Sequence, residues 1–255
     1  MSAKRSVIIV TYGRTGSTLL VGLLNSAKGT LIRGENGNVF YHLFKAYETL
    51  VQVRKRGGAA QNHPFYGINK TDLPGFLSLC QQAVDKVLMP GGGLFGGPTT
   101  IGFKEIRYLN MEEGELSNYL DFMQLIFPDP LFVFLTRDHE QVLSSGFYIK
   151  KNNKEKIAGQ LAACDKAFAN IVASRRNAFA IDYADLKADS ARLRDLFAAA
   201  GLEYDPARIA SVLKVDHSPQ TPKHLKKSRW KGGASEDAQE DTREDSVAET
   251  GEDAR

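Results

Sequence analysis

Residues 7–24, VIIVTYGRTGSTLLVGLL, constrain the fold of this chain more than any other stretch. They begin with four β-branched apolar residues, which predict a short buried strand. Gly13 and Gly16 then frame a tight loop, and the sequence from Ser17 onward predicts a helix. A strand, a glycine loop and a helix in this order surround one point with backbone N–H groups and the positive end of a helix dipole. The stretch therefore predicts an anion site to which Arg14 adds a fixed charge, with an ordinary strand-to-helix turn as the alternative.

The composition fits a soluble globular protein, with 42% hydrophobic and 25% charged residues among 255. No run approaches the roughly 18 apolar residues that a membrane span needs. The N-terminal apolar run is too short for a signal peptide and leads straight into the glycine loop. Cys80 and Cys164 are far apart in the sequence and imply neither a disulfide framework nor a zinc site. We therefore expect a cytoplasmic protein without a bound metal.

The net charge of +3 is unevenly distributed along the chain. Residues 231–255 contain nine acidic and three basic residues, so residues 1–230 carry a net charge of +9. The acidic segment lacks aromatic residues and has few large apolar ones, which predicts a disordered tail. The basic remainder suits an anionic ligand. Nucleic acid is disfavoured as a partner because no basic helix with interleaved aromatic residues is present.

Apolar runs and helical periodicity alternate along the rest of the chain and predict alternating strands and helices. Strands are expected at Leu31–Ile32, Thr99–Tyr108, 131–136 and Ala178–Ile181; helices are expected at Val39–Arg54, Pro74–Leu88, Met111–Ile126, from His139 onward, and at Glu155–Arg175, Ala191–Ala200 and Pro206–Lys214. The glycine-rich run 90–98 predicts a loop. This alternation predicts an α/β protein, with a P-loop-like three-layer fold in which helices flank a central parallel sheet.

A second anion motif follows the apolar run 131–136, which is typical of a strand buried on both faces. Arg137 comes directly after it, at the strand end where open α/β sheets bind ligands. Ser144 and Ser145 are expected in the first turns of the next helix. A guanidinium and a hydroxyl can converge on one phosphate, although an ion pair with Asp138 is an alternative role for the arginine. Two phosphate sites at two strand ends predict a nucleotide that is phosphorylated at two places.

These motifs resemble those of the sulfotransferase superfamily that uses 3′-phosphoadenosine 5′-phosphosulfate (PAPS). Residues 12–20 are similar to the family's 5′-phosphosulfate loop. Residues 135–146 are similar to its 3′-phosphate motif, and residues 181–186 resemble a later strand-and-turn block. The resemblance extends from about residue 5 to residue 214. It implies a sulfotransferase domain over residues 1–230, with residues 36–98 as an insertion on the acceptor side.

The resemblance also implies roles for individual residues. The 5′-phosphosulfate would be held by Gly13, Arg14, Thr15, Gly16, Ser17 and Thr18. Arg14 would in addition stabilise the leaving oxygen and is therefore a catalytic candidate. Arg137 and Ser145 would hold the 3′-phosphate, with the family's eight-residue step between them. The cofactor would be PAPS, with no metal requirement.

Carbohydrate and related bacterial members of this superfamily place a catalytic glutamate shortly after the first helix. Glu35 matches that pattern, because the chain descends one helix and returns toward the sheet edge before reaching it. A solvated loop glutamate is the alternative. Since cytosolic members use a histidine, His42 and His63 remain alternative bases, whereas His139 is expected to start a helix. The glutamate pattern favours a carbohydrate or glycolipid acceptor.

Two further basic positions are candidates for the site. Lys104 and Arg107 alternate with apolar residues on a predicted strand, and the Gly-Phe-Lys sequence there is similar to that of related sulfotransferases. Lys104 either lines the site or ends the strand in solvent. The basic run 223–230, which includes Arg229, either covers the 3′-phosphate, as a C-terminal segment does in relatives, or forms a solvated linker.

Two other functions are alternatives to sulfuryl transfer. A P-loop kinase or NTPase would carry G-x-x-x-x-G-K-[ST], but alignment on Gly16 puts Thr11 in place of the first glycine and Ser17 in place of the lysine. Both departures disfavour ATP. A catalytically inactive nucleotide-binding relative would have lost the role of Glu35, because both nucleotide motifs are intact. The sequence makes no prediction of oligomeric state.

Overall fold

The computed structural model describes residues 5–89, 97–109 and 111–215, and strand β1 (Arg5–Thr11) lies at its centre. The sheet has five strands in the order β2-β3-β1-β4-β5, and all four pairings are parallel. The other strands are β2 (Thr30–Arg33), β3 (Thr100–Glu105), β4 (Pro130–Thr136) and β5 (Ala178–Asp182). Residues 6–11 of β1 are all buried, as expected for a central strand that is covered on both faces. The predicted α/β fold with a parallel sheet is confirmed.

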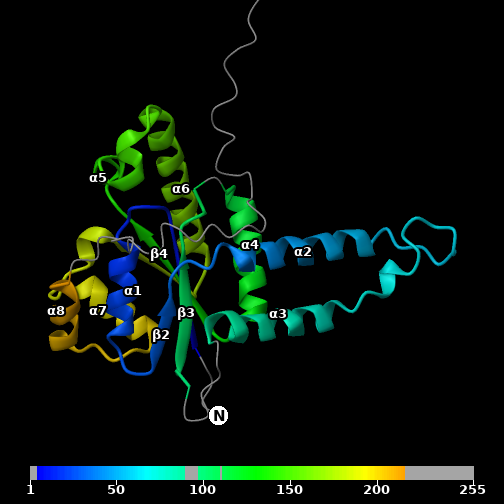
Figure 1. Ribbon diagram of the computed structural model, residues 1–255, viewed down its shortest axis with the longest axis horizontal. Helices are drawn as coiled ribbons and strands as arrows, with labels where there is room; N and C mark the ends of the chain where they lie inside the picture. Colours follow the sequence, from blue (N-terminus) through cyan, green and yellow to red (C-terminus); the bar gives the residue numbers. More distant parts are fainter. Residues whose placement is uncertain (1–4, 90–96, 110, 216–255) are drawn as a thin grey trace, which may run out of the picture. The chain divides into compact units, whose positions relative to one another are not determined.

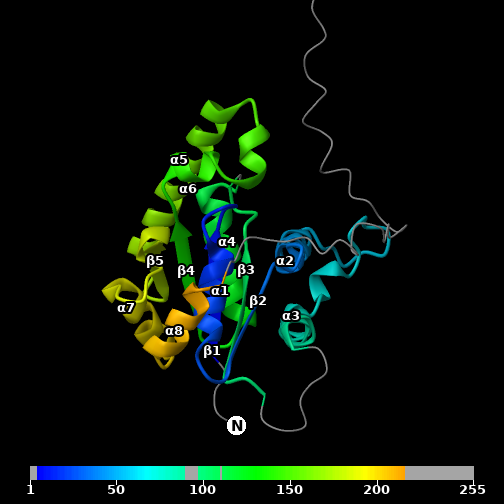
Figure 2. The same cartoon turned by 60° about the vertical axis from the view of Figure 1, so that its left-hand side comes forward.

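Helices cover both faces of the sheet and complete the three layers (Figures 1 and 2). One face packs on α1 (Ser17–Asn25), α7 (Ala191–Ala200) and α8 (Pro206–Leu213); the other packs on α4 (Glu113–Ile126) and α6 (Lys154–Ser174). Alternate residues of β1 divide between these layers: Val7 and Ile9 belong to the first core, and Ile8 and Val10 to the second. The central strand therefore joins both hydrophobic cores.

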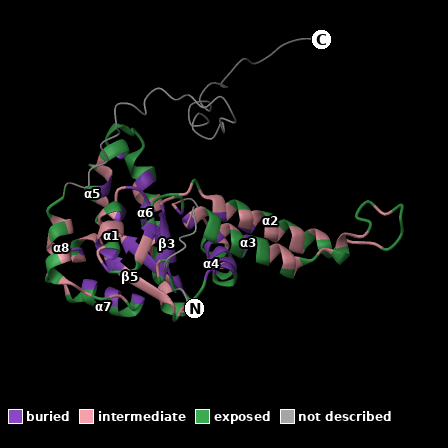
Figure 3. Cartoon of the chain, turned by 60° about the horizontal axis from the view of Figure 1, so that its bottom comes forward, coloured by how far each residue is buried: buried purple, intermediate pink, exposed green. Residues whose placement is uncertain are grey.

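Helices α2 (Val39–Arg54) and α3 (Leu73–Leu88) form a hairpin that extends away from the sheet (Figures 1 and 3). Phe40 anchors its base, with ring centroids 5.0 Å from those of Phe103 and Phe127. The connection between the helices includes the short 3₁₀ helix η1 (Ile68–Lys70) and lies at the far end of the hairpin. The hairpin falls inside the predicted insertion 36–98, whose role on the acceptor side remains a prediction.

Two elements end earlier than predicted. Helix α5 (His139–Leu143) stops before Ser144 and Ser145, so the prediction that both serines lie inside a helix was wrong. Gly146 adopts a φ of 58°, which turns the chain into the 3₁₀ helix η2 (Gly146–Lys150). Strand β3 ends at Glu105 rather than Tyr108, because the Glu105 side chain accepts the next backbone N–H at 2.9 Å.

Several predicted features lie outside the described residues. These are Arg229 with the basic run 223–230, the domain end at residue 230, the acidic tail 231–255 and most of the glycine-rich run 90–98. Among the helices of the described ranges, none is long and apolar enough to cross a membrane.

The packing of β3 against β1 yields a stability prediction. A Cβ atom on Gly102 would collide with the carbonyl oxygen of Val7, and backbone cannot move aside as a side chain can. We expect Gly102→Ala to lower the free energy of unfolding by about 1–3 kcal/mol, measured by urea denaturation. The matched control is Gly159→Ala in α6, where a Cβ meets nothing within 4 Å and helix propensity favours alanine by about 1 kcal/mol. Equal stability of the two variants would contradict this account.

Candidate functional site

The two predicted anion motifs lie at the same edge of the sheet. Because β1 and β4 are parallel neighbours, with Thr11 beside Leu135, the loops that follow both strands leave the sheet side by side. The first loop leads into α1, and the second carries Arg137. This edge, formed by the carboxyl ends of the strands, is where open parallel sheets bind ligands.

The loop after β1 has the backbone geometry of an anion site. Gly16 adopts a φ of 83° as the residue that caps α1, and no side chain caps this end of the helix. A Cβ on Gly16 would also collide with the ring of Tyr183, so only glycine fits there. Arg14 takes a φ of 71°, which is unusual for a residue with a side chain and is a form of strain found at functional sites. The N-terminal amides of α1 are therefore presented without a side-chain competitor.

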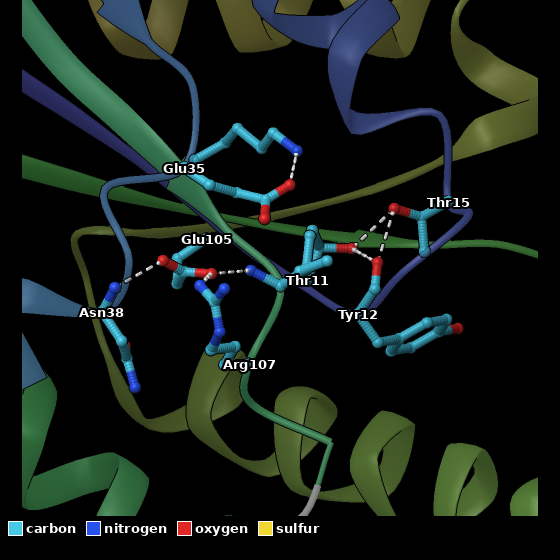
Figure 4. Close-up of polar contacts among 9 residues, drawn as sticks. Thr11, Tyr12, Thr15, Glu35, Asn38, Glu105 and Arg107 are labelled. Carbon is cyan, nitrogen blue, oxygen red and sulfur yellow. Dashed lines mark hydrogen bonds and ion pairs between the residues drawn. The ribbon is translucent and has the colours of Figure 1, made fainter. Parts of the chain in front are cut away.

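Hydroxyl groups inside the loop hold it in shape (Figure 4). The Thr11 Oγ1 lies 2.8 Å from the Thr15 Oγ1 and donates to the carbonyl of Leu135 at 2.6 Å. Thr15 is fully buried and also bonds to the Tyr12 carbonyl at 3.2 Å. The Thr15 side chain thus maintains the loop, and only its backbone can face a ligand. Of the other two predicted hydroxyls, that of Thr18 is exposed and that of Ser17 is buried.

The structure brings Arg14, Arg137 and Ser145 together. The Arg14 Nε donates to the Ser145 Oγ at 3.0 Å, and an Arg137 Nη1 donates to the Arg14 carbonyl at 3.0 Å. Three residues predicted from two separate motifs therefore form one hydrogen-bonded cluster. Two glycines allow the close packing around this cluster. A Cβ on Gly13 would collide with the ring of Phe147, and a Cβ on Gly146 would collide with the side chain of Arg14.

Two residues that the sequence reasoning did not select hold Arg137. The Gln141 Oε1 accepts from both Nε and Nη2 of Arg137, at 3.2 and 3.1 Å. The ring of Tyr183 lies 4.0 Å from the guanidinium carbon, as a cation–π contact. The spacing of four residues at a helix start could have indicated Gln141, and Tyr183 lies in the strand-and-turn block 181–186. Asp138 does not take the alternative role of ion-pair partner to Arg137; it caps α5 by accepting from the Gln141 N–H at 3.0 Å.

Tyr12 connects this cluster to α6. Its hydroxyl bonds to the backbone of Arg137 at 3.3 and 3.4 Å. Burial raises the pKa of the Tyr12 phenol far above its usual value, and the carboxylate of Asp165 raises it further. Asp165 in turn pairs with the His139 Nε2 at 2.8 Å. His139 starts α5, as predicted.

Glu35 and Lys104 form an ion pair at the carboxyl ends of β2 and β3 (Figure 4). The side chain of Lys104 is 11% exposed and that of Glu35 is 34% exposed. Lys104 therefore does not end its strand in solvent. The two candidates that sequence reasoning treated separately are direct partners.

Glu105 is a buried acid that sequence reasoning missed. It is fully buried and accepts from the backbone N–H groups of Asn38 at 3.0 Å and Ile106 at 2.9 Å. An Nη1 of Arg107 donates to it at 2.7 Å, so Arg107 is committed to this acid. Glu105 thus fixes the start of α2, which follows the turn that carries Glu35 (Figure 4). An acid at a strand end with a cation two residues later was the signal available in the sequence.

A family model described as "Sulfotransferase family" matches residues 6–206. The chain belongs to the sulfotransferase family. The match covers both predicted anion motifs, Glu35 and the hairpin, and it favours this family over the P-loop kinases. No curated protein matches the sequence of this sulfotransferase.

Two solved structures are similar to this sulfotransferase at low identity. The sulfotransferase domain of the olefin synthase from Synechococcus PCC 7002 shares 13% identity, with 85% of this chain and 79% of that chain covered and a TM-score of 0.49. An unliganded sugar kinase from Janibacter shares 12% identity, with 80% of this chain and 98% of that chain covered and a TM-score of 0.34. At these scores neither structure supports an argument about function.

The alternative bases of this sulfotransferase lie on the hairpin. His42 is exposed in the first turn of α2. His63 belongs to the connection at the far end of the hairpin, where its Nδ1 accepts from the Phe65 N–H at 3.1 Å (Figure 1). Within the described ranges, no group of three His, Cys, Asp or Glu side chains is placed to hold a metal ion.

The contacts of Glu105 predict a large stability effect. Glu105→Ala leaves two backbone donors and one guanidinium without their acceptor in a buried place, so we expect the free energy of unfolding to fall by about 2–4 kcal/mol. Glu112→Ala is the matched control, because Glu112 is exposed and its side chain does not cap α4; its effect should be within about 0.5 kcal/mol. Chemical denaturation of both variants measures the difference. A Glu105 variant as stable as the control would show that the cluster does not hold the turn.

Proposed function

We propose that this sulfotransferase moves a sulfuryl group from PAPS to an acceptor hydroxyl, with Glu35 as the base. The observation that carries the proposal is the meeting of Arg14, Arg137 and Ser145 in one cluster, at the same sheet edge as the Glu35–Lys104 pair. The cluster provides cations that can bind the anionic donor, and the pair provides a carboxylate that can take up the proton of the acceptor hydroxyl.

The residues of the cluster fit a doubly phosphorylated nucleotide. The uncapped start of α1 supports a 5′-phosphate site, because its amides and dipole favour an anion. The Ser145 Oγ accepts from Arg14, and among the described residues its own hydroxyl proton has no acceptor. Ser145 can therefore donate to a 3′-phosphate while it remains bonded to Arg14. This hydrogen bond couples the residue proposed for one phosphate to the residue proposed for the other.

Arg14 and Arg137 have different tasks in this proposal. Arg137 is held flat between Gln141 and Tyr183, which orients its remaining N–H groups toward a phosphate. Arg14 stabilises the negative charge that develops on the leaving oxygen during transfer. A preorganised cation at that place lowers the barrier, because it needs no rearrangement when the charge appears. PAPS supplies the activated sulfuryl group when bound.

Glu35 is oriented for the acceptor by Lys104. The ammonium holds the Oε1 of the carboxylate, and the Oε2 has no partner among the described residues. That second oxygen is available for the proton of an acceptor hydroxyl. We propose a carbohydrate or glycolipid acceptor from the resemblance of Glu35 to the glutamate of carbohydrate sulfotransferases, with no metal taking part. A cytoplasmic location is supported by two cysteines, Cys80 and Cys164, that are buried and unpaired.

The donor site predicts a selective thermal response. We expect 3′-phosphoadenosine 5′-phosphate to stabilise the protein by about 2.7 kcal/mol at one hundred times its Kd. Arg137→Ala should weaken this binding by about tenfold or more, because a hydrogen bond to a charged group contributes about 1.5–3 kcal/mol. The matched control is Arg192→Ala, since Arg192 also lies 4.0 Å from an aromatic ring, that of Phe179, and donates to a carbonyl. If ATP with magnesium stabilised the protein and 3′-phosphoadenosine 5′-phosphate did not, the proposal would be contradicted.

The base is tested by a separate change. We expect Glu35→Gln to reduce sulfuryl transfer from labelled PAPS by about 10²–10⁴-fold, because the amide cannot take up a proton. Thermal stabilisation by 3′-phosphoadenosine 5′-phosphate should persist. Glu48→Gln is the matched control, since Glu48 also pairs with a lysine, Lys45, at 2.6 Å. Full activity of the Glu35 variant would show that Glu35 is not the base and would favour a histidine in that role. If the native chain transferred no sulfuryl group to any acceptor tested, the protein would instead be a catalytically inactive relative.

A further inference from the structure

The far end of the α2–α3 hairpin has no part in the proposed reaction, yet its surface is distinctive. Residues 54–71, here called the hairpin tip, comprise the last residue of α2, the connection and η1. In Figures 1 and 3 the tip lies at the end of the hairpin remote from the sheet. The tip is thus displayed at a distance from the cluster of Arg14 and Arg137.

The charge of the tip is entirely positive. It carries four exposed cations and no Asp or Glu: Arg54, Lys55, Arg56 and Lys70. Nearer the sheet, the hairpin balances its charge, and Lys45 pairs with both Glu48 and Glu115. Residues 1–230 carry a net charge of +9, and the tip supplies +4 of it within 18 residues. The tip is therefore a concentrated basic patch, which favours attraction to an anionic surface.

Two aromatic side chains stand exposed among these cations. Phe65 is 37% exposed and Tyr66 is 54% exposed. The turn that presents them is internally bonded: Gly58 N–H donates to the Phe65 carbonyl at 3.3 Å, and Tyr66 N–H donates to the His63 carbonyl at 2.9 Å. The Arg56 guanidinium lies 6.0 Å from the Phe65 ring. The exposure of both rings is thus built into an ordered turn.

We propose that the hairpin tip binds the surface of an anionic lipid bilayer. Its cations would contact the headgroup phosphates, while Phe65 and Tyr66 would enter the boundary between headgroups and acyl chains. Clustered Lys and Arg beside aromatic rings favour this interface, since anionic headgroups attract the charges and aromatic side chains partition there. The end of a helical hairpin is suited to a flat surface, whereas an extended nucleic acid would favour a groove lined with cations. The proposal requires nothing of the sulfuryl-transfer reaction.

Sedimentation of the full chain with vesicles tests the role of charge. We expect binding to vesicles of equal parts phosphatidylcholine and phosphatidylglycerol, and none to phosphatidylcholine alone. The variant Arg54→Gln, Lys55→Gln, Arg56→Gln should bind at least tenfold more weakly, because each cation near such a surface contributes about fivefold.

The matched control removes the same charge elsewhere. The variant Lys151→Gln, Lys154→Gln, Lys156→Gln neutralises three exposed lysines around the start of α6 and should bind within about twofold of the native chain. All changed side chains are exposed, so unchanged melting temperatures establish that both variants fold. Equal losses in the two variants, or no binding of the native chain to the anionic vesicles, would overturn the proposal.

A fluorescent probe tests insertion independently of the charge variants. The single native tryptophan, Trp230, is replaced by Phe, and Phe65→Trp then reports on the tip alone. With anionic vesicles we expect a blue shift of the emission and quenching by brominated acyl chains; an unchanged spectrum would overturn the proposal. Binding of a single-stranded RNA that is lost with the tip cations, without any vesicle binding, would instead identify the tip as a nucleic-acid surface.

Discussion

The parallel pairing of β1 with β4 is the constraint on which the site depends. The hydrogen bond from the Thr11 hydroxyl to the carbonyl of Leu135, at 2.6 Å, joins the carboxyl end of β1 to that of β4. It fixes the two following loops relative to each other, and the Arg14–Ser145 and Arg137–Arg14 contacts follow from that placement. If the register slipped by one residue, every side chain of the strand would turn to the opposite face. The placement of both predicted anion motifs therefore depends on the pairing of these two central strands.

Local patterns made much of the fold predictable from the sequence. The strand, loop and helix around Gly16 depend on apolar runs and on a backbone conformation that favours glycine, and both can be read from neighbouring residues. The convergence of Arg14 and Arg137 also followed, because carboxyl ends of parallel strands share one edge. Ser145 shows the limit of such reasoning, because the helix predicted to contain it ends at Leu143. Ser145 nevertheless contacts Arg14, because the chain after β4 runs beside the loop that follows β1.

The partners of the predicted residues could not be found in the same way. Tyr183 reaches Arg137 from the segment directly after β5, and the Lys104–Glu35 pair joins β3 to the turn after β2. Such contacts depend on the directions in which side chains from distant segments point at the edge of the sheet. The periodicity of the sequence gives no information about these directions. Glu105 was missed because strand propensity disfavours a buried acid, whereas the folded chain supplies it with three donors.

Lys104 and Glu105 show how one strand end can control a loop through both of its faces. Successive residues of a strand point to opposite sides of the sheet, so the two side chains diverge. Lys104 binds the carboxylate of Glu35, while Glu105 binds the backbone of Asn38 three residues later. The short segment between β2 and α2 is thus held at two points by neighbouring residues of β3. In the proposed reaction, a carboxylate held in this way would lose little conformational freedom when it takes up the proton, and such positioning favours general base catalysis.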